Sequence, residues 1–285
     1  MGAIGRAAMR IAGWLAAGPR RLALAGVAAG LCAGLGAGTG AARAGELVVG
    51  AAASLREPVE WLAEAQRRAH PETTLRVSFG ASSVIAAQIR LGAPLDAFLS
   101  ANRALVEDLV ARDRVAEEDV FAFARNGLVV IAPSRGAAAL ADPGRLSAPS
   151  IARIALPSAA VPLGRYARAW LDAEGLLAAV REKIVVTEHA RSTLAAVDAG
   201  HADLGIVYAT DARASTRSRV VYVVPPSRAP EIAYYAARTL TGRRNRDTQA
   251  FIAALQGPAF AEALHRAGFL PVPADDARAG ETARP

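Results

Sequence analysis

The 285-residue chain contains one cysteine, Cys32, and one lysine, Lys183, and only 5% of its residues are aromatic. A single cysteine excludes an intramolecular disulfide framework and any metal site built from clustered cysteines. The chain has four histidines, His70, His189, His201 and His265. None of them stands in a metal-ligand pattern such as H-E-x-x-H, and no glycine-rich phosphate loop is present. The sequence therefore offers little for metal or nucleotide chemistry.

Acidic residues are missing from residues 1–44, which contain five arginines. Without this segment the 33 basic residues of the chain fall to 28, against 26 acidic ones, a net charge of +2. A protein with so little net charge is not expected to bind nucleic acid, because that affinity comes largely from basic side chains that neutralise phosphates. We therefore expect no nucleic-acid partner.

Residues 1–44 have the pattern of an export signal. A pair of arginines precedes a weakly apolar run at 22–35, and an A-x-A cleavage pattern follows at 42–44. The run is short and rich in glycine, unlike a transmembrane anchor. We predict a signal peptide over 1–44 and an exported mature protein. A twin-arginine route through the arginine pair and lipid attachment at Cys32 are the alternatives.

From residue 46 onward, short apolar runs alternate with amphipathic stretches. Strands are expected at 47–49, 75–79, 97–99, 127–132, 154–156, 183–186, 204–207, 220–224 and 232–235. Helices are expected at 59–68, 84–91, 104–111, 165–173, 193–199, 247–255 and 259–265. Strands separated by segments of helix length are typical of parallel sheets. The pattern thus predicts an α/β fold.

The order of these elements favours two lobes, each a mostly parallel sheet flanked by helices. We place the first lobe at 45–125 and 225–273 and the second at 126–224, so that the chain crosses between them more than once. The tail at 274–285 is small and polar and is expected to be disordered. Lobes of this kind bind ligands at their strand ends, in the cleft between them.

Two serines stand at junctions between a strand and a helix. Ser54 follows the first expected strand, and Ser82 follows the second. Either serine can be an ordinary helix N-cap. The same position also suits anion binding, because a helix N-terminus presents free N–H groups and a serine hydroxyl adds a donor. Two such ends that face one cleft would form a neutral oxyanion site.

Several segments resemble the periplasmic molybdate-binding proteins of molybdate ABC transporters. The resemblance covers about residues 46 to 270, and its parts occur in the family's order. The matching segments are A-A-A-S-L at 51–55, F-G-A-S-S at 79–83, G-A-P-L-D-A-F-L-S-A at 92–101, V-P-L-G-R-Y-A at 161–167 and L-G-I-V-Y at 204–208. One departure is Asn102, which stands where the family commonly has aspartate.

The resemblance implies the two-lobed fold of type II periplasmic binding proteins and a site made of neutral hydrogen-bond donors. Ser54 and Ser82 would each donate a hydroxyl and a backbone N–H from the first lobe. Leu163 and Ala190 would donate backbone N–H groups, and Tyr208 its phenol, from the second lobe. An anion that carries a proton, as phosphate can, would find no acceptor for it in such a site.

The resulting prediction is an exported solute-binding protein that captures molybdate, and also tungstate, and delivers it to the permease of an ABC importer. We expect a monomer without catalytic residues or cofactor, which would hold the metal only through the oxygens of the anion. One alternative is another oxyanion, such as sulfate or thiosulfate, on the same scaffold. A second is an exported serine hydrolase that uses Ser54 or Ser82, and a third is a sensory module that docks on a receptor.

Overall fold

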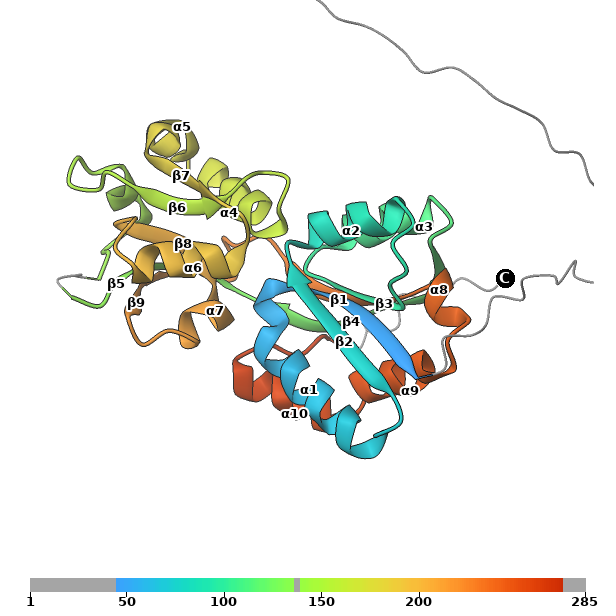
Figure 1. Ribbon diagram of the computed structural model, residues 1–285. Helices are drawn as coiled ribbons and strands as arrows, with labels where there is room; N and C mark the ends of the chain where they lie inside the picture. Colours follow the sequence, from blue (N-terminus) through green and yellow to red (C-terminus); the bar gives the residue numbers. More distant parts are fainter. Residues whose placement is uncertain (1–44, 136–138, 274–285) are drawn as a thin grey trace, which may run out of the picture. The chain divides into compact units, whose positions relative to one another are not determined.

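The computed structural model describes residues 45–135 and 139–273. Within these ranges the chain forms two five-stranded sheets, each flanked by helices, as Figure 1 shows. The predicted α/β class with two helix-flanked sheets is confirmed. The predicted signal peptide over 1–44, with Cys32, and the predicted tail at 274–285 lie outside the described residues.

The first sheet has the strand order β2-β1-β3-β10-β4. Its strands are β1 (Glu46–Ala52), β2 (Thr74–Gly80), β3 (Ala97–Ser100), β4 (Val115–Asn126) and β10 (Ile232–Thr239). β1 pairs in parallel with β2 and with β3, so these three strands end at the same edge of the sheet. The fully buried apolar residues of β1 and β3 make this sheet the centre of a hydrophobic core.

Helices cover both faces of the first sheet. α2 (Ser82–Arg90) and α3 (Arg103–Val110) lie on one face, and α1 (Arg56–Ala69), α9 (Arg246–Leu255) and α10 (Pro258–Ala267) lie on the other (Figure 1). The short helix α8 (Leu240–Arg243) directly follows β10. α1 shows how these helices form, because apolar side chains three or four residues apart face the core, among them Val59 and Leu62.

The second sheet has the order β7-β6-β8-β5-β9. Its strands are β5 (Leu128–Pro133), β6 (Ile154–Pro157), β7 (Ile184–Thr187), β8 (Leu204–Tyr208) and β9 (Ser218–Val223). Its helices are α4 (Pro162–Ala173), α5 (Leu177–Val180), α6 (Ala190–Asp198) and α7 (Ala209–Arg213), with short 3-10 turns at Ala53–Leu55, Pro143–Ser147 and Arg181–Lys183 completing the fold. The parallel strands β6, β7 and β8 again end at one edge.

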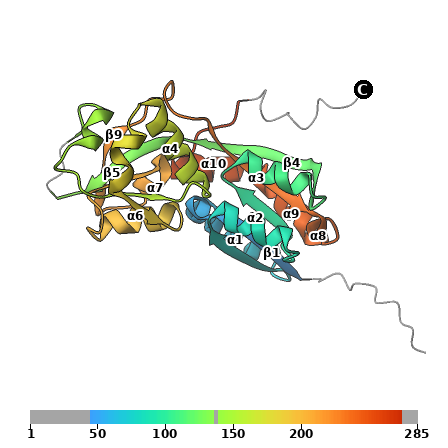
Figure 2. The same cartoon turned by 90° about the horizontal axis from the view of Figure 1, so that it is seen from above.

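The chain passes between the sheets at two points. β4 leads directly into β5, as the view from above in Figure 2 shows, and the segment between β9 and β10 leads back. A strand that enters a sheet at the edge where the parallel strands end must run against them. β10 is accordingly antiparallel to β3, and β5 is antiparallel to β8. Each sheet is therefore mixed, with two parallel and two antiparallel pairings, which corrects the expectation of mostly parallel sheets.

One long strand was missed in the sequence. β4 covers Val115–Asn126, where only a strand from 127 was expected. Its first half contains an acidic run at 117–119, which is unusual in a strand. The contact that accommodates it is distant in sequence, because Asp119 Oδ1 accepts a hydrogen bond from Arg238 Nε of β10 at 2.9 Å. The short helices α5, α7 and α8 were also not expected.

Candidate functional site

The two serines singled out in the sequence lie at the carboxyl ends of neighbouring strands. Ser54 lies in the 3-10 turn that follows β1, and Ser82 is the first residue of α2, just after β2. Because β1 and β2 are parallel and in register up to Ala52 and Gly80, the two turns emerge side by side. Both serine side chains are buried, each with only 2% of its surface exposed.

The three predicted donors of the second sheet also lie at strand ends. Leu163 is the second residue of α4, Ala190 is the first residue of α6, and Tyr208 is the last residue of β8. All three are buried. The first N–H groups of a helix have no partner within the helix, so the Leu163 and Ala190 amides are in the position that a ligand can use.

All five predicted residues line the same small cavity. The remaining lining consists of small or apolar residues and His189. No Lys, Arg, Asp or Glu contributes to this lining among the residues that the structure describes. The structure therefore brings together donors from both sheets around a space without ionised side chains.

The hydrogen bonds of Ser82 leave its hydroxyl hydrogen available. Ser82 Oγ accepts a hydrogen bond from the backbone N–H of Ala101 at 3.1 Å. A hydroxyl that accepts in this way still has one hydrogen to donate. Ser54 has a different partner, since its Oγ lies 2.8 Å from the Tyr234 hydroxyl.

The Tyr208 hydroxyl is buried and has no hydrogen-bond partner in the described part of the chain. Burial raises the pKa of Tyr208 well above its ordinary value, with smaller contributions from neighbouring groups that include Asp211. The phenol therefore keeps its proton and remains a donor. A buried polar group without a partner costs about 1–3 kcal/mol, which an oxygen atom in the cavity would offset.

His189 caps helix α6 rather than adding charge to the cavity. Its Nδ1 accepts from the Ser192 backbone N–H at 3.1 Å, and Ser192 Oγ accepts from the His189 backbone N–H at 2.9 Å. Burial lowers the pKa of His189, although the nearby Glu188 opposes this shift. The capping bonds use the Ser192 amide and leave the amide of Ala190, two residues earlier, to the cavity.

Side chains near the cavity also join the two sheets. The Tyr166 hydroxyl of α4 lies 3.1 Å from Asn102 Nδ2 and 3.2 Å from the Ala101 carbonyl oxygen, both just after β3. Arg191 of α6 forms ion pairs with Glu57 of α1 and with the buried Asp211, where Nε lies 3.0 Å from Oδ1. Sequence reasoning did not assign these contacts.

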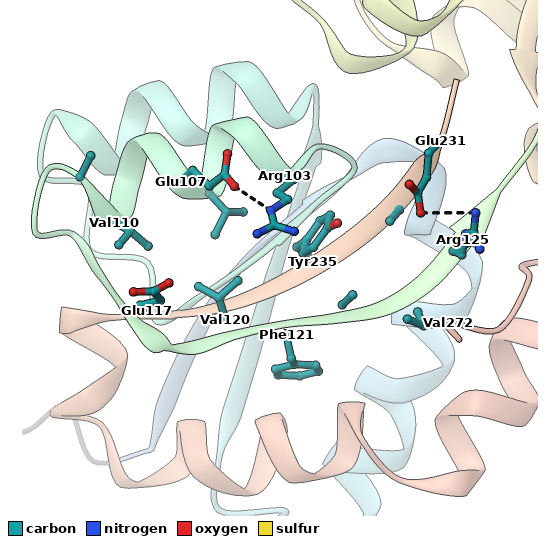
Figure 3. Close-up of a pocket in the computed structure, with 14 residues that line it drawn as sticks. Arg103, Glu107, Val110, Glu117, Val120, Phe121, Arg125, Glu231, Tyr235 and Val272 are labelled. Carbon is teal, nitrogen blue, oxygen red and sulfur yellow. Dashed lines mark hydrogen bonds and ion pairs between the residues drawn. The ribbon is translucent and has the colours of Figure 1, made fainter. Parts of the chain in front are cut away.

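A larger cavity lies elsewhere, between α3 and strands β4 and β10 (Figure 3). Its volume is about 340 Å³, and none of the five predicted residues lines it. Four of its five charged side chains form ion pairs, Arg103 with Glu107 and Arg125 with Glu231. Because all five predicted residues line the small cavity at the strand ends, that cavity is the candidate site. The described residues contain no cluster of three or more His, Cys, Asp or Glu suited to a metal ion.

Comparison with known proteins identifies the family of the chain. Residues 47–270 match the family described as bacterial extracellular solute-binding protein. The chain belongs to this family. The match extends through every helix and strand described above except the first residue of β1.

Named relatives within the curated proteins cover most of the chain. The molybdate-binding protein ModA of Haemophilus influenzae is 30% identical over 232 residues, which are 80% of this chain and 91% of that protein. ModA of Escherichia coli K12 is 32% identical over 237 residues, 79% of this chain and 89% of the relative. The solved structure of the Azotobacter vinelandii periplasmic molybdate-binding protein superimposes with a TM-score of 0.71 at 23% identity, over 80% of this chain and 99% of that chain.

Membership in the solute-binding family excludes the serine hydrolase as an alternative function. The family consists of binding proteins, and so the chain is a solute-binding protein and not an enzyme. Ser54 and Ser82 are therefore not catalytic residues of a hydrolase.

No described helix is long and apolar enough to cross a bilayer.

Proposed function

We propose that this solute-binding protein captures molybdate, and also tungstate, and hands it to the permease of an ABC importer. The observation that carries the proposal is the cavity at the strand ends, which is lined by Ser54, Ser82, Leu163, Ala190 and Tyr208 and by no ionised side chain. The names of the relatives in Haemophilus influenzae and Escherichia coli support the same ligand.

The physical basis is a match between a doubly charged anion and neutral donors. Charge-assisted hydrogen bonds are roughly twice as strong as bonds between neutral groups, and exclusion of water strengthens them further. The anion brings its own charge, so an arginine or lysine in the cavity is not needed. The Tyr208 hydroxyl and the hydroxyl hydrogen of Ser82 support this role, since neither has an acceptor among the residues that the structure describes.

Closure of two lobes would complete the donor set. We propose that residues 45–125 with 225–273 move as one lobe and residues 126–224 as the other, about the two segments that connect the sheets. The closed form would present a joint surface that a permease can recognise. Export to the periplasm through the signal at 1–44 and a monomeric state belong to the same proposal.

Isothermal titration of the purified protein tests the ligand, after dialysis has removed any bound anion. Molybdate, tungstate, sulfate and phosphate are titrated in separate experiments. We expect one-to-one binding of molybdate and tungstate and none of phosphate. Sulfate or thiosulfate is the second candidate, because a site of neutral donors suits any fully deprotonated tetrahedral oxyanion. Tight sulfate binding without molybdate binding would replace the proposed ligand.

A further inference from the structure

A buried chain of hydrogen bonds leads from the end of β4 to the Ser54 hydroxyl. Asn126, the last residue of β4, places its Nδ2 3.2 Å from the Tyr234 hydroxyl oxygen. The Tyr234 hydroxyl in turn lies 2.8 Å from Ser54 Oγ. All three side chains are buried, and Tyr234 is completely inaccessible. Buried polar groups of this kind are constrained to satisfy one another.

The donor and acceptor in each of these hydrogen bonds follow from the backbone beside Asn126. Asn126 Oδ1 lies 2.9 Å from the backbone nitrogen of Gly127, which can only donate a hydrogen bond. The carbonyl oxygen of the amide must therefore face Gly127, and Nδ2 must face the other way. Nδ2 has two hydrogens, and its two acceptors are Tyr234 Oη and Thr210 Oγ1, the latter at 2.8 Å.

This orientation determines how the hydroxyl hydrogens are arranged. Tyr234 Oη receives a hydrogen from Asn126, and among the described residues Ser54 Oγ is the one acceptor within hydrogen-bond distance of its own hydrogen. We therefore infer that Tyr234 donates to Ser54 Oγ. Burial, together with the nearby Asp211 carboxylate, raises the pKa of Tyr234 far above its ordinary value, so the phenol stays protonated. Ser54 Oγ is thereby an acceptor toward Tyr234, and its hydrogen is left for the cavity that it lines.

We propose that Asn126 and Tyr234 are positioning residues that make Ser54 an obligate donor, and that they thereby set the preference for oxyanions without a proton. The inference rests on the proposed function and adds a cause for its selectivity. The Ala101 amide imposes the same direction on Ser82. Each serine oxygen then already accepts one hydrogen bond and directs its own hydrogen at the cavity. A ligand hydroxyl such as that of hydrogenarsenate therefore meets hydrogens instead of lone pairs and loses its own hydrogen bond.

The first variant is Tyr234→Phe, which keeps the ring and removes the link to Ser54. Without Tyr234 Oη, the Ser54 hydroxyl can rotate and can accept as well as donate. We expect molybdate affinity to fall about tenfold, which corresponds to about 1.4 kcal/mol, and the ratio of molybdate to hydrogenarsenate affinity to fall with it. Tyr222→Phe is the matched control, because it removes a phenol hydroxyl from a ring stacked on Trp170 outside the cavity. It should leave both values unchanged.

A double-mutant cycle separates positioning from a general loss of packing. If Tyr234 acts through Ser54, then Tyr234→Phe has no further effect on molybdate affinity in a Ser54→Ala background. Additive losses in the double variant would overturn the proposal, even if each single variant binds more weakly. Thermal unfolding of each variant identifies those that are folded, and the cycle is read from these alone.

Asn126→Asp tests the direction of the hydrogen bond between Tyr234 and Ser54. A carboxylate in this position accepts from both Gly127 N–H and Tyr234 O–H, so Tyr234 Oη would accept from Ser54 and the Ser54 lone pairs would face the cavity. We expect molybdate affinity to fall at least tenfold and the relative affinity for hydrogenarsenate to rise. An unchanged preference in a folded Asn126→Asp protein would contradict the inference.

Titration of the unsubstituted protein separates failure of the proposed function from failure of the role given to Asn126 and Tyr234. If it binds molybdate and the cycle is additive, the proposed function stands and the role of Asn126 and Tyr234 is refuted. If it binds none of the tested oxyanions, both the proposed function and this inference fail.

Discussion

The hydroxyl of Tyr166 lies 3.1 Å from the side-chain nitrogen of Asn102, and this contact connects the two sheets. Tyr166 belongs to α4, the helix whose first turn holds Leu163, and Asn102 is the N-cap of α3, two residues after the end of β3. The Tyr166 hydroxyl also donates to the Ala101 carbonyl oxygen at 3.2 Å. Both contacts join α4 to the segment after β3, and we propose that they hold the closed form of the two lobes.

Removal of the Tyr166 hydroxyl should therefore favour opening. We expect Tyr166→Phe to release molybdate about three- to tenfold faster, because a neutral hydrogen bond contributes about 0.5–1.5 kcal/mol. Stopped-flow fluorescence with excess tungstate as competitor measures the release rate. Tyr222→Phe serves again as the control, and equal release rates for all three proteins would show that this contact does not hold the closed form.

The two donors with available hydrogens give the most direct test of the site. Ser82→Ala and Tyr208→Phe should each weaken molybdate binding by about 1.5–3 kcal/mol, the range for hydrogen bonds to charged groups. Ser83→Ala is the matched control for Ser82, because Ser83 is the next residue of α2 and does not line the cavity. Isothermal titration gives the three affinities. Retention of full affinity by both site variants would remove these donors from the site.

The stability of the protein should depend on the protonation of Asp211. Complete burial raises the pKa of Asp211 to about 7, and Glu57 adds to this shift, while Arg191 and the Tyr208 backbone N–H oppose it. An unfolded aspartate loses its proton near pH 4, so between about pH 4 and about pH 7 the folded state binds more protons. The free energy of unfolding should then fall as pH rises through this window, by at most about 1.4 kcal/mol per pH unit for one proton, and level off above it.

Urea unfolding at a series of pH values measures this slope, and Asp211→Asn provides the comparison. Asparagine has the same shape and does not titrate, so the difference between the two proteins isolates the contribution of this carboxyl. Parallel stability curves across the whole window would show that Asp211 is ionised in the folded protein throughout. Arg191 keeps its ion pair with Glu57 in the variant, which preserves the contact between α6 and α1.

A site residue could be predicted from the sequence where its role shows in the residues next to it in the chain. Ser54 and Ser82 were visible because a serine between an apolar strand and a helix is a local pattern. Leu163 and Ala190 carry no such signal, since a backbone N–H is the same in every residue, and only the family resemblance pointed to them. Asn126 and Tyr234 were missed because each acts through a partner that is more than one hundred residues away.

The same distinction applies to the fold. Alternation of strands and helices along the chain was enough to predict the α/β class, because each β-α unit is formed by neighbouring residues. The mixed pairing was not predictable in this way. It arises where β10 returns to the first sheet from the second and lies between β3 and β4, so that Tyr235 pairs with Ser100 on one side and with Ala122 on the other.

Gly164 links the fold to the site, because it allows the start of α4 to lie against the end of β6. A Cβ atom at Gly164 would overlap the carbonyl oxygens of Ser158 and Pro157, which are backbone atoms that cannot rotate away. In Gly164→Ala the first turn of α4, including the Leu163 amide, must therefore shift. We expect a loss of about 1–3 kcal/mol in the free energy of unfolding, as for overpacked sites, together with weaker molybdate binding.

Gly80→Ala is the control for stability alone, because nothing lies within 4 Å of a Cβ added there, whereas Gly80 itself lines the cavity. Urea unfolding and isothermal titration on the same protein samples measure the two effects. The effects should appear together in Gly164→Ala, since one displacement of α4 causes both. A variant with lowered stability and full molybdate affinity would show that the Leu163 amide does not contact the ligand, and would leave the second sheet with Ala190 and Tyr208 as its donors.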